Sequence, residues 1–462
     1  MSVTGAVIVP HPPLLLPEVG RGREREVQDT LDAYRAAARR AADWKPGLLV
    51  LFSPHAPMYA DYFHIAPGKT GRWDMASFGA PQVRLEAAYD EEFREALTAR
   101  AEAAGLRAGP LGDRPQHQDH GTAVPLYFLR EAGLDCPIVR IGLSGFPPLA
   151  HYALGRCVAE TAEALGRRVV CVASGDLSHK LRQDGPYGFA PEGPVFDQQI
   201  TAAMAEGDFF QFLTMDPGLC GRAAECGLRS FQIMAGALDG QAVQAELLSH
   251  QGNFGVGYAV AVFTPTGPDE SRRFARRCGE LERERLAARR AAEDPWVQLA
   301  RLSLETYVRT GQRLPSLPAD LPQPLLAGRA GAFVSLHKHG QLRGCIGTIA
   351  PTAASLAEEI VRNAVSAGTG DPRFPPVRPQ ELEELEYSVD VLGAPEKIAS
   401  PAELDVRRYG VIVSRGGRRG LLLPDLEGVD TVEDQIAIAR QKAGIGPRES
   451  FELERFEVVR HT

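Results

Sequence analysis

Cysteine is scarce in this 462-residue chain, and no two of its seven cysteines form a C-x-x-C pair. Because their number is odd, we do not expect a complete disulfide framework and predict a reducing, cytoplasmic setting. No apolar run approaches the roughly 20 residues that a membrane-spanning helix requires. The apolar N-terminus lacks a basic segment and is interrupted by Pro10, Pro12 and Pro13, so it does not resemble a signal peptide.

An excess of positive charge is also absent, since the formal net charge is −8. This argues against a general binder of nucleic acid or of anionic membranes. The hydrophobic content of 44% and the charged content of 24% are ordinary for a soluble globular protein. The length predicts two or three domains, each large enough for its own core.

Strand-like and helical segments alternate through the first part of the chain. Strands are expected at 6–9, 48–53, 137–143, 168–173 and 257–263, and helices at 23–43, 90–104, 149–166, 195–213 and 222–239. This alternation predicts an α/β domain over residues 1–268, with a central sheet flanked by helices.

The rest of the chain predicts a linker and a second domain. Residues 269–294 are dense in Arg and Glu, which indicates a charged, solvated linker helix. A nucleic-acid arm is the alternative, but the interleaved glutamates cancel its charge. Residues 295–462 predict a smaller α+β domain, with hairpins at 331–348 and 409–423 and a helix at 431–443.

Two proline-flanked histidines follow strand-like runs near the N-terminus. His11 stands in Val-Pro-His-Pro-Pro after 6–9, and His55 stands in Ser-Pro-His-Ala-Pro after 48–53. Because proline cannot donate to a strand ladder, each strand should stop just before its histidine. Open α/β sheets build their sites at the ends of such strands. The two imidazoles are therefore candidate ligands for a divalent metal.

Glu225 is a candidate for the third ligand. If 222–239 is a helix, Glu225 lies three residues before Leu228 on its apolar face, where an unpaired carboxylate would be costly. Two histidines and a carboxylate form the facial triad of non-haem Fe(II) oxygenases, and zinc accepts the same ligands. Alternatively, the histidines cap strand ends and Glu225 pairs with Arg222 or Arg229.

Two further histidines each lie beside a predicted core element. His120 occurs in Asp119-His120-Gly121, and His179 ends the segment 173–179, directly after an apolar strand. His179 is a candidate general acid/base because a free imidazole titrates near neutral pH, and Asp176 could orient it. His120 could contact substrate or bound oxygen. Either histidine could instead be structural.

Taken together, these motifs resemble the LigB-type domain of the class III extradiol ring-cleavage dioxygenases, to which the Memo proteins are related. The resemblance rests on Pro10-His11-Pro12, Ser53-Pro54-His55, Asp119-His120-Gly121, residues 173–179 and Glu225-Cys226-Gly227. It implies that Fe(II) is held by His11, His55 and Glu225, with His179 as the acid/base residue and His120 in the active site. The implied reaction opens a catechol-like aromatic substrate beside its paired hydroxyls and inserts both atoms of O₂.

One position departs from that pattern. Memo-like relatives have a cysteine near the carboxylate position, and here Glu225 and Cys226 are adjacent. Cys226 is therefore an alternative ligand or a redox thiol. Two other functions stay open: a zinc-dependent enzyme without redox chemistry, and a Memo-like metal-binding scaffold without dioxygenase activity.

Residues 295–462 resemble the AMMECR1 domain, chiefly through the segment Leu342-Arg343-Gly344-Cys345-Ile346-Gly347-Thr348. Cys345 could be a nucleophile, because its flanking glycines leave the backbone open to close approach. The alternative is a small buried residue whose glycines permit tight packing. Fusions of a Memo-like domain with an AMMECR1 domain are named after a system that includes a radical-SAM protein. The resemblance therefore implies a radical-SAM partner. No radical-SAM cysteine motif occurs here, so such a partner would be a separate protein.

Overall fold

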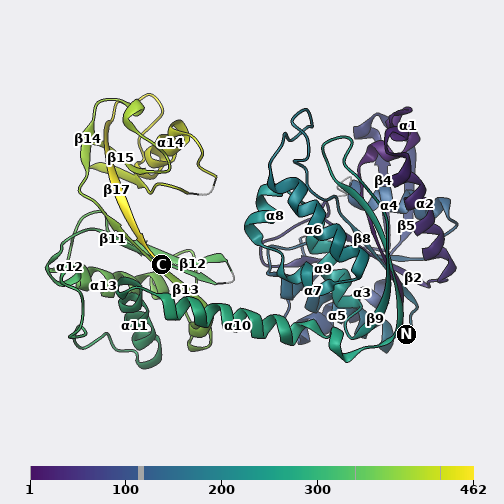
Figure 1. The fold of residues 1–462 in the computed structure, drawn as a ribbon, viewed down its shortest axis with the longest axis horizontal. Coiled ribbons are helices and arrows are strands. Elements are labelled where there is room, and N and C mark those ends of the chain that lie inside the picture. The colour runs from purple at the N-terminus through teal and green to yellow at the C-terminus, as the bar shows by residue number, and fades with distance from the viewer. Residues whose placement is uncertain (1, 113–118, 339, 427) are drawn as a thin grey trace. The chain divides into compact units, whose positions relative to one another are not determined.

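The computed structural model describes residues 2–112, 119–338, 340–426 and 428–462. The chain divides into two compact units, Met1–Glu280 and Leu281–Thr462 (Figure 1). The first unit is α/β and the second is α+β, as the sequence predicts. Within the described ranges, no helix combines the length and apolarity needed to cross a membrane.

The first unit is built on a six-stranded sheet with the order β7-β2-β8-β1-β10-β9. Its strands are β1 (Val3–Val9), β2 (Leu48–Ser53), β7 (Ile138–Gly142), β8 (Val169–Ser174), β9 (Gln241–Gln251) and β10 (Tyr258–Pro268). The strands β7, β2, β8 and β1 are parallel, whereas β10 and β9 are antiparallel additions. All residues of β2 and β8 are buried, as expected for parallel strands covered on both faces.

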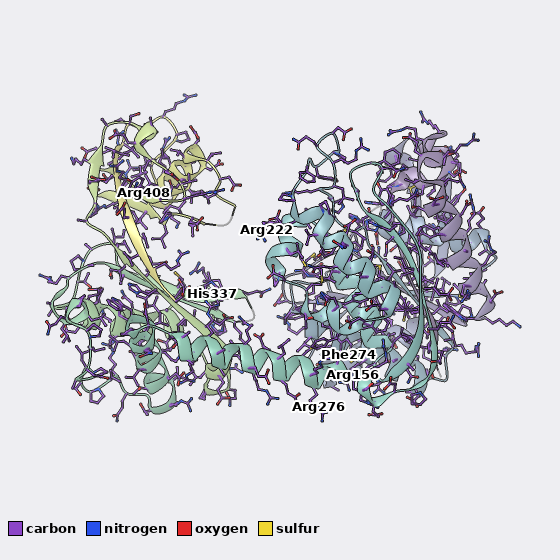
Figure 2. The ribbon with its side chains drawn as sticks, viewed as in Figure 1. Arg156, Arg222, Phe274, Arg276, His337 and Arg408 are labelled. Atoms are coloured by element: carbon purple, nitrogen blue, oxygen red, sulfur yellow. The ribbon has the colours of Figure 1, made fainter. Side chains whose placement is uncertain are left out.

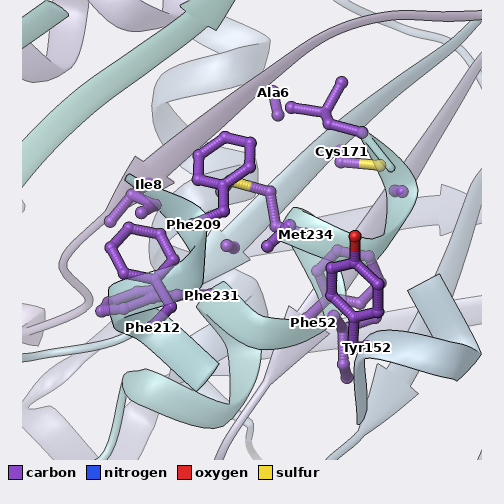
Figure 3. Packing of buried hydrophobic residues seen from close by; sticks show 14 of the residues in the cluster. Ala6, Ile8, Phe52, Tyr152, Cys171, Phe209, Phe212, Phe231 and Met234 are labelled. Carbon is purple, nitrogen blue, oxygen red and sulfur yellow. The ribbon is translucent and has the colours of Figure 1, made fainter. Parts of the chain in front are cut away.

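Helices cover both faces of this sheet. One face packs against α3 (Glu91–Ala103), α5 (Pro148–Ala164), α6 (Glu192–Glu206), α7 (Phe209–Thr214) and α9 (Leu228–Ala237). The other face packs against α2 (Gln28–Asp43) and α4 (His120–Glu131). Figure 3 shows the first of these cores, where aromatic rings from α7 and α9 lie near Ile8 of β1. Alternate residues of each strand therefore serve two separate cores.

Short elements complete this unit. The strand pairs are β3 (Phe63–His64) with β6 (Ala108–Gly109) and β4 (Thr70–Met75) with β5 (Ala80–Ala88). The short helices are α1 (Pro17–Gly20), α8 (Pro217–Ala223) and the 3₁₀ segments Pro13–Leu15, Arg23–Val27, Ala76–Phe78 and Glu270–Arg272.

Two predicted helices are interrupted in the structure. The segment 195–213 is divided at Gly207, which has a φ of 67° and ends α6. The prediction of one helix over 222–239 is wrong at its start, because α8 ends at Ala223 and α9 begins only at Leu228. Between them Ala224 adopts a left-handed conformation with a φ of 55°. Glu225 therefore lies in a loop and not on a helix face.

The charged segment between the two predicted domains forms α10 (Phe274–Ala292). One side of its first turns is not solvated, since Phe274 and Cys278 are buried in the core of the first unit. Arg276 between them projects outward, with its side chain 88% exposed (Figure 2). Further along, Arg285 pairs with Glu386 of the second unit. The prediction of a solvated helix thus describes only part of α10.

The second unit contains a curled antiparallel sheet with the order β12-β11-β13-β17-β15-β16, and β14 pairs with β17. Its strands are β11 (Ala332–Lys338), β12 (Gln341–Gly347), β13 (Leu385–Leu392), β14 (Glu396–Ile398), β15 (Tyr409–Arg415), β16 (Arg418–Leu422) and β17 (Glu452–His461). The helices are α11 (Pro295–Thr310), α12 (Gln323–Ala327), α13 (Leu356–Thr369) and α14 (Val432–Ala443), with 3₁₀ segments at Pro379–Glu384 and Pro401–Glu403. Both predicted hairpins and the predicted helix at 431–443 are confirmed.

Candidate metal centre

His11 and His55 meet at the carboxyl edge of the parallel strands. β1 ends two residues before His11, β2 ends two residues before His55, and β8 lies between the two strands. The Nε2 atoms of the two histidines are 2.9 Å apart. Two lone pairs at this distance repel each other unless a proton or a cation lies between them. The predicted meeting of the two imidazoles is thus present in the structure.

Contacts around His11 prepare its Nε2 atom to be a ligand. Its Nδ1 is 3.0 Å from the Ser174 hydroxyl, and its backbone N–H donates to Asp176 Oδ1 at 2.9 Å. With Nδ1 protonated and bonded to Ser174, the lone pair of the ring is at Nε2. Burial, reinforced by the nearby His55, lowers the pKa of His11 well below its usual value. The imidazole is therefore neutral, as metal binding requires.

Cys226 supplies the third atom of the cluster. Its Sγ lies 3.7 Å from His11 Nε2, and the three potential ligand atoms all lie within 4.8 Å of one another. His11 is buried, Cys226 is partly buried and His55 is exposed, so the cluster is open on one side. Burial raises the pKa of the Cys226 thiol, but a bound metal deprotonates a coordinating thiol. The donor set of two imidazoles and one thiolate fits a divalent transition metal.

Glu225 lies outside this cluster. Its Oε2 accepts a hydrogen bond from the backbone N–H of Leu228 at 2.7 Å, so the carboxylate caps the start of α9. The loop is held by close backbone packing, because a Cβ on Gly175 would lie 2.2 Å from the Cα of Gly227. This contact brings Cys226 against the segment that follows β8. Of the two candidates that the sequence offers for the third ligand, the structure therefore brings Cys226, and not Glu225, into the cluster with His11 and His55.

His120 borders the same cluster. Its ring centroid is 3.9 Å from that of His55 and 5.4 Å from that of His11. Burial lowers the pKa of His120 to about 4, so the ring is neutral at pH 7. Asp119 fixes its position by capping α4 and accepting a 2.6 Å hydrogen bond from the Ser53 hydroxyl at the end of β2. The structure places His120 where a molecule beside His55 would touch it.

His179 also faces this site, and its charged form would lower the pKa values of both His11 and His55. Its Nδ1–H donates to the backbone carbonyl of Ala224, which leaves Nε2 free to exchange a proton. The carbonyl is available because Ala224 adopts the left-handed conformation that interrupts the helical segment. Ala224, and not Asp176, therefore orients the His179 ring.

Asp176 instead lies behind His11. Besides accepting the backbone N–H of His11, it places Oδ2 at 3.7 Å from His11 Nε2. Burial raises the pKa of Asp176 to about 7, although the His11 N–H opposes that shift. The carboxyl group thus titrates near neutrality beside the cluster.

Sequence reasoning assigned nothing to two contacts of the site. Ser174 could have been found, since it is the polar residue at which a fully apolar strand ends. Tyr187, whose ring centroid lies 5.1 Å from that of His179, comes from a loop without a recognisable pattern.

Cys345, the candidate of the second unit, lies on β12. Its Sγ accepts a hydrogen bond from the Ser335 hydroxyl at 3.2 Å, and its backbone N–H donates to Asp371 Oδ2 at 2.9 Å. Asp371 in turn forms an ion pair with Arg373 at 2.7 Å. The thiol is partly exposed and borders a cleft.

Comparison with known proteins agrees with this division of the chain. Residues 5–261 match the family described as the catalytic LigB subunit of aromatic ring-opening dioxygenase, and residues 297–461 match the AMMECR1 family. Protein CA_C1420 of Clostridium acetobutylicum is 37% identical over 100% of this chain and 99% of its own length. A Thermotoga maritima protein is 52% identical over 37% of this chain and 98% of its own length.

Two solved structures are also similar to parts of the chain. The uncharacterized protein PH0010 from Pyrococcus horikoshii is 34% identical and matches 36% of this chain and 88% of its own, with a TM-score of 0.34. The uncharacterized protein JW3007 from Escherichia coli K12 is 18% identical and matches 56% of this chain and 99% of its own, with a TM-score of 0.36. The LigB match covers more than half of the chain. The chain therefore belongs to the family of the catalytic LigB subunit of aromatic ring-opening dioxygenases and carries an AMMECR1 domain after it.

Proposed function

We propose that the first unit is an Fe(II)-dependent dioxygenase-type enzyme that opens a catechol-like aromatic ring. His11, His55 and Cys226 would hold the metal. The observation that carries the proposal is the cluster of these three donor atoms, open beside the exposed His55 and bordered by two further histidines. When bound, Fe(II) would supply the redox chemistry that joins O₂ to the substrate.

The residues around the cluster would bind the substrate and move its protons. His179 Nε2 would accept the proton of a substrate hydroxyl, while its Nδ1–H stays bonded to Ala224. The neutral His120 ring would contact the substrate on the side of His55. Asp176, with a pKa of about 7, would hold a second proton near the cluster.

A zinc-dependent enzyme without redox chemistry is the second candidate. The observation that favours it is the sulfur of Cys226, because zinc sites readily combine thiolate and imidazole ligands. Such an enzyme would use the same three ligands and the same acid/base residue, but it would not consume O₂.

Metal content and oxygen uptake test the two candidates together. The full chain, purified without oxygen, should contain iron and should consume O₂ with catechol or 4-methylcatechol but not with resorcinol, whose hydroxyls are not adjacent. With ¹⁸O₂, both labelled atoms should appear in the ring-opened product.

The variant His179→Gln should keep the iron and lose turnover by roughly 10²–10⁴-fold, the usual contribution of general acid/base catalysis. Stoichiometric zinc, with no oxygen uptake after loading with iron, would reject the dioxygenase and support the second candidate.

A further inference from the structure

A cleft of about 690 Å³ opens in the second unit, within the AMMECR1 domain and the last turns of α10. One part of its lining is apolar and comes from Phe333, Leu342, Ile349, Leu421 and Leu426. Another part is basic and comes from Arg289, Arg373, Arg419, Lys442 and Arg460. Asp390 is the only carboxylate side chain among the described residues that line it. The cleft thus combines an apolar surface with an excess of positive charge.

The basic groups differ in how far their charges are already compensated. The four arginines are held by carboxylates at 2.5–2.8 Å: Arg289 by Glu386, Arg373 by Asp371, Arg419 by Glu454 and Arg460 by Asp390.

Lys442 lies exposed on α14 and makes no ion pair with any described residue. Partial desolvation beside the cleft lowers the pKa of Lys442, and the nearby Arg373 lowers it further. An anion in the cleft would therefore gain most from contact with Lys442.

The Cys345 thiol lies beside these two cations. Arg373 donates from Nη2 to the carbonyl oxygen of Cys345 at 3.3 Å, and Asp371 holds both the backbone of Cys345 and the guanidinium. Cys345 and Lys442 both line the cleft, and a thiolate at Cys345 would raise the pKa of Lys442. A molecule bound by Lys442 and Arg373 would contact the sulfur.

Two glycines allow the helices to approach the cleft closely. A Cβ on Gly344, next to Cys345, would lie 2.2 Å from the carbonyl oxygen of Ala367 in α13. A Cβ on Gly420 would lie 2.1 Å from the carbonyl oxygen of Ala439 in α14. The second contact seats α14 on β16, which places Lys442 on the cleft. The glycine before Cys345 therefore serves packing, while the thiol itself stays accessible.

We propose that this cleft binds a small organic anion, a carboxylate or a phosphate ester with an apolar body. Lys442 and Arg373 bind the anionic group, the apolar lining covers the body, and the Cys345 thiol contacts the bound molecule. This site lies wholly within the second unit and is independent of the metal chemistry proposed for the first.

Alkylation of Cys345 in the full chain tests the proposal, with iodoacetate as an anionic probe and iodoacetamide as its neutral counterpart. Labelling of the Cys345 peptide is followed by mass spectrometry. The ratio of the iodoacetate rate to the iodoacetamide rate should exceed that of N-acetylcysteine amide by at least about tenfold, because a basic cleft concentrates anions. High salt should reduce this excess. Lys442→Gln should lower the ratio, whereas Lys442→Arg and the remote control Lys397→Gln should preserve it.

Competition then identifies the anionic group. Benzoate or phenyl phosphate should slow the labelling by iodoacetamide, and the more effective of the two distinguishes a carboxylate site from a phosphate site. Benzyl alcohol should have no such effect. Equal protection by benzyl alcohol, a ratio equal to that of the free thiol, or no labelling by either reagent would overturn the proposal.

Discussion

At the scale of single residues, the neighbours Glu225 and Cys226 have different roles that the sequence does not distinguish: one caps a helix and the other is a candidate metal ligand. The Cys226 thiol lies in the cluster with His11, whereas the Glu225 carboxylate caps α9. Cys226→Ser should therefore weaken Fe(II) binding by more than the roughly 10–100-fold that the loss of an outer-shell contact costs.

Glu225→Gln is the matched control, because its amide oxygen can still accept the Leu228 N–H. It should leave metal affinity within about threefold of the parent value, well below the effect of losing even an outer-shell contact. Equilibrium titration with Fe(II) under argon measures both variants. The opposite order of effects would support the carboxylate triad suggested by the sequence.

His151 gives the first unit a dependence of stability on pH. The buried ring accepts the Ser144 N–H at Nε2 and bonds the Pro147 carbonyl through Nδ1, and burial lowers its pKa to about 3. Below pH 6.5 the unfolded chain therefore binds a proton that the folded chain does not. The stabilising effect of the neutral ring is complete above pH 6.5 and is lost as the pH falls toward 3.

The variant His151→Gln tests this linkage. It should reduce the slope of the unfolding free energy between pH 5 and 6 by about 1.4 kcal/mol per pH unit, the effect of one proton. Urea unfolding of the metal-free protein at several pH values gives the slope. An unchanged slope would mean that His151 is already protonated in the folded protein.

At the scale of elements, α5 and α9 pack through a glycine on each helix. A Cβ on Gly155 would lie 1.9 Å from the carbonyl oxygen of Ile233, and one on Gly236 would lie 1.9 Å from that of Tyr152. Since both obstacles are backbone atoms, neither can rotate away. Gly155→Ala should destabilise the first unit by at least about 1–3 kcal/mol, the usual cost of overpacking.

Gly279→Ala is the control for this change. Gly279 lies within α10, and a Cβ there would meet nothing within 4 Å. This substitution should stabilise the protein by about 0.5–1 kcal/mol, because alanine loses less backbone entropy in a helix. Denaturant unfolding of the full chain compares the two variants. An unchanged unfolding free energy for Gly155→Ala would show that α5 and α9 can move apart without loss of stability.

The sequence predicts elements best where burial is uniform. The strands β2 and β8 are apolar throughout and buried on both faces, so their positions and the histidine after β2 could be anticipated. The polar edge strand β9 was not predicted, because half-exposed residues give it no clear alternation.

The sequence left Glu225 and Cys226 as alternative ligands, and it could not place them for a conformational reason. The left-handed residue Ala224 breaks an otherwise helical pattern, and alanine gives no warning of such a conformation. Only the folded chain shows that this break brings Cys226 to His11.

At the scale of the whole molecule, α10 belongs to both units. Phe274 and Cys278, in its first turns, are buried in the core of the first unit, Met1–Glu280. A fragment of residues 1–280 should fold and bind metal with the affinity of the full chain. The fragment 1–268, which ends where the sequence suggests, should be less stable by about 2–5 kcal/mol, since it loses two buried side chains. Metal titration and urea unfolding compare the two fragments. Equal stability would show that α10 is a spacer.

The stability of the second unit should depend on the C-terminal half of α10. Arg285 and Arg289 bind the buried Glu386 at 2.7 and 2.5 Å, and Glu293 pairs with the buried Arg301. The fragment 281–462 should therefore be the most stable form, and 291–462 should lose up to about 3–5 kcal/mol because Glu386 loses both of its cationic partners. The fragment 295–462 should lose more stability, since Arg301 then loses Glu293.

Glu386→Gln should narrow the difference in stability between the fragments 281–462 and 291–462, because a neutral amide needs no cationic partner. Thermal and urea unfolding measure the series, and equal stability of all three fragments would contradict a structural function for this end of the helix.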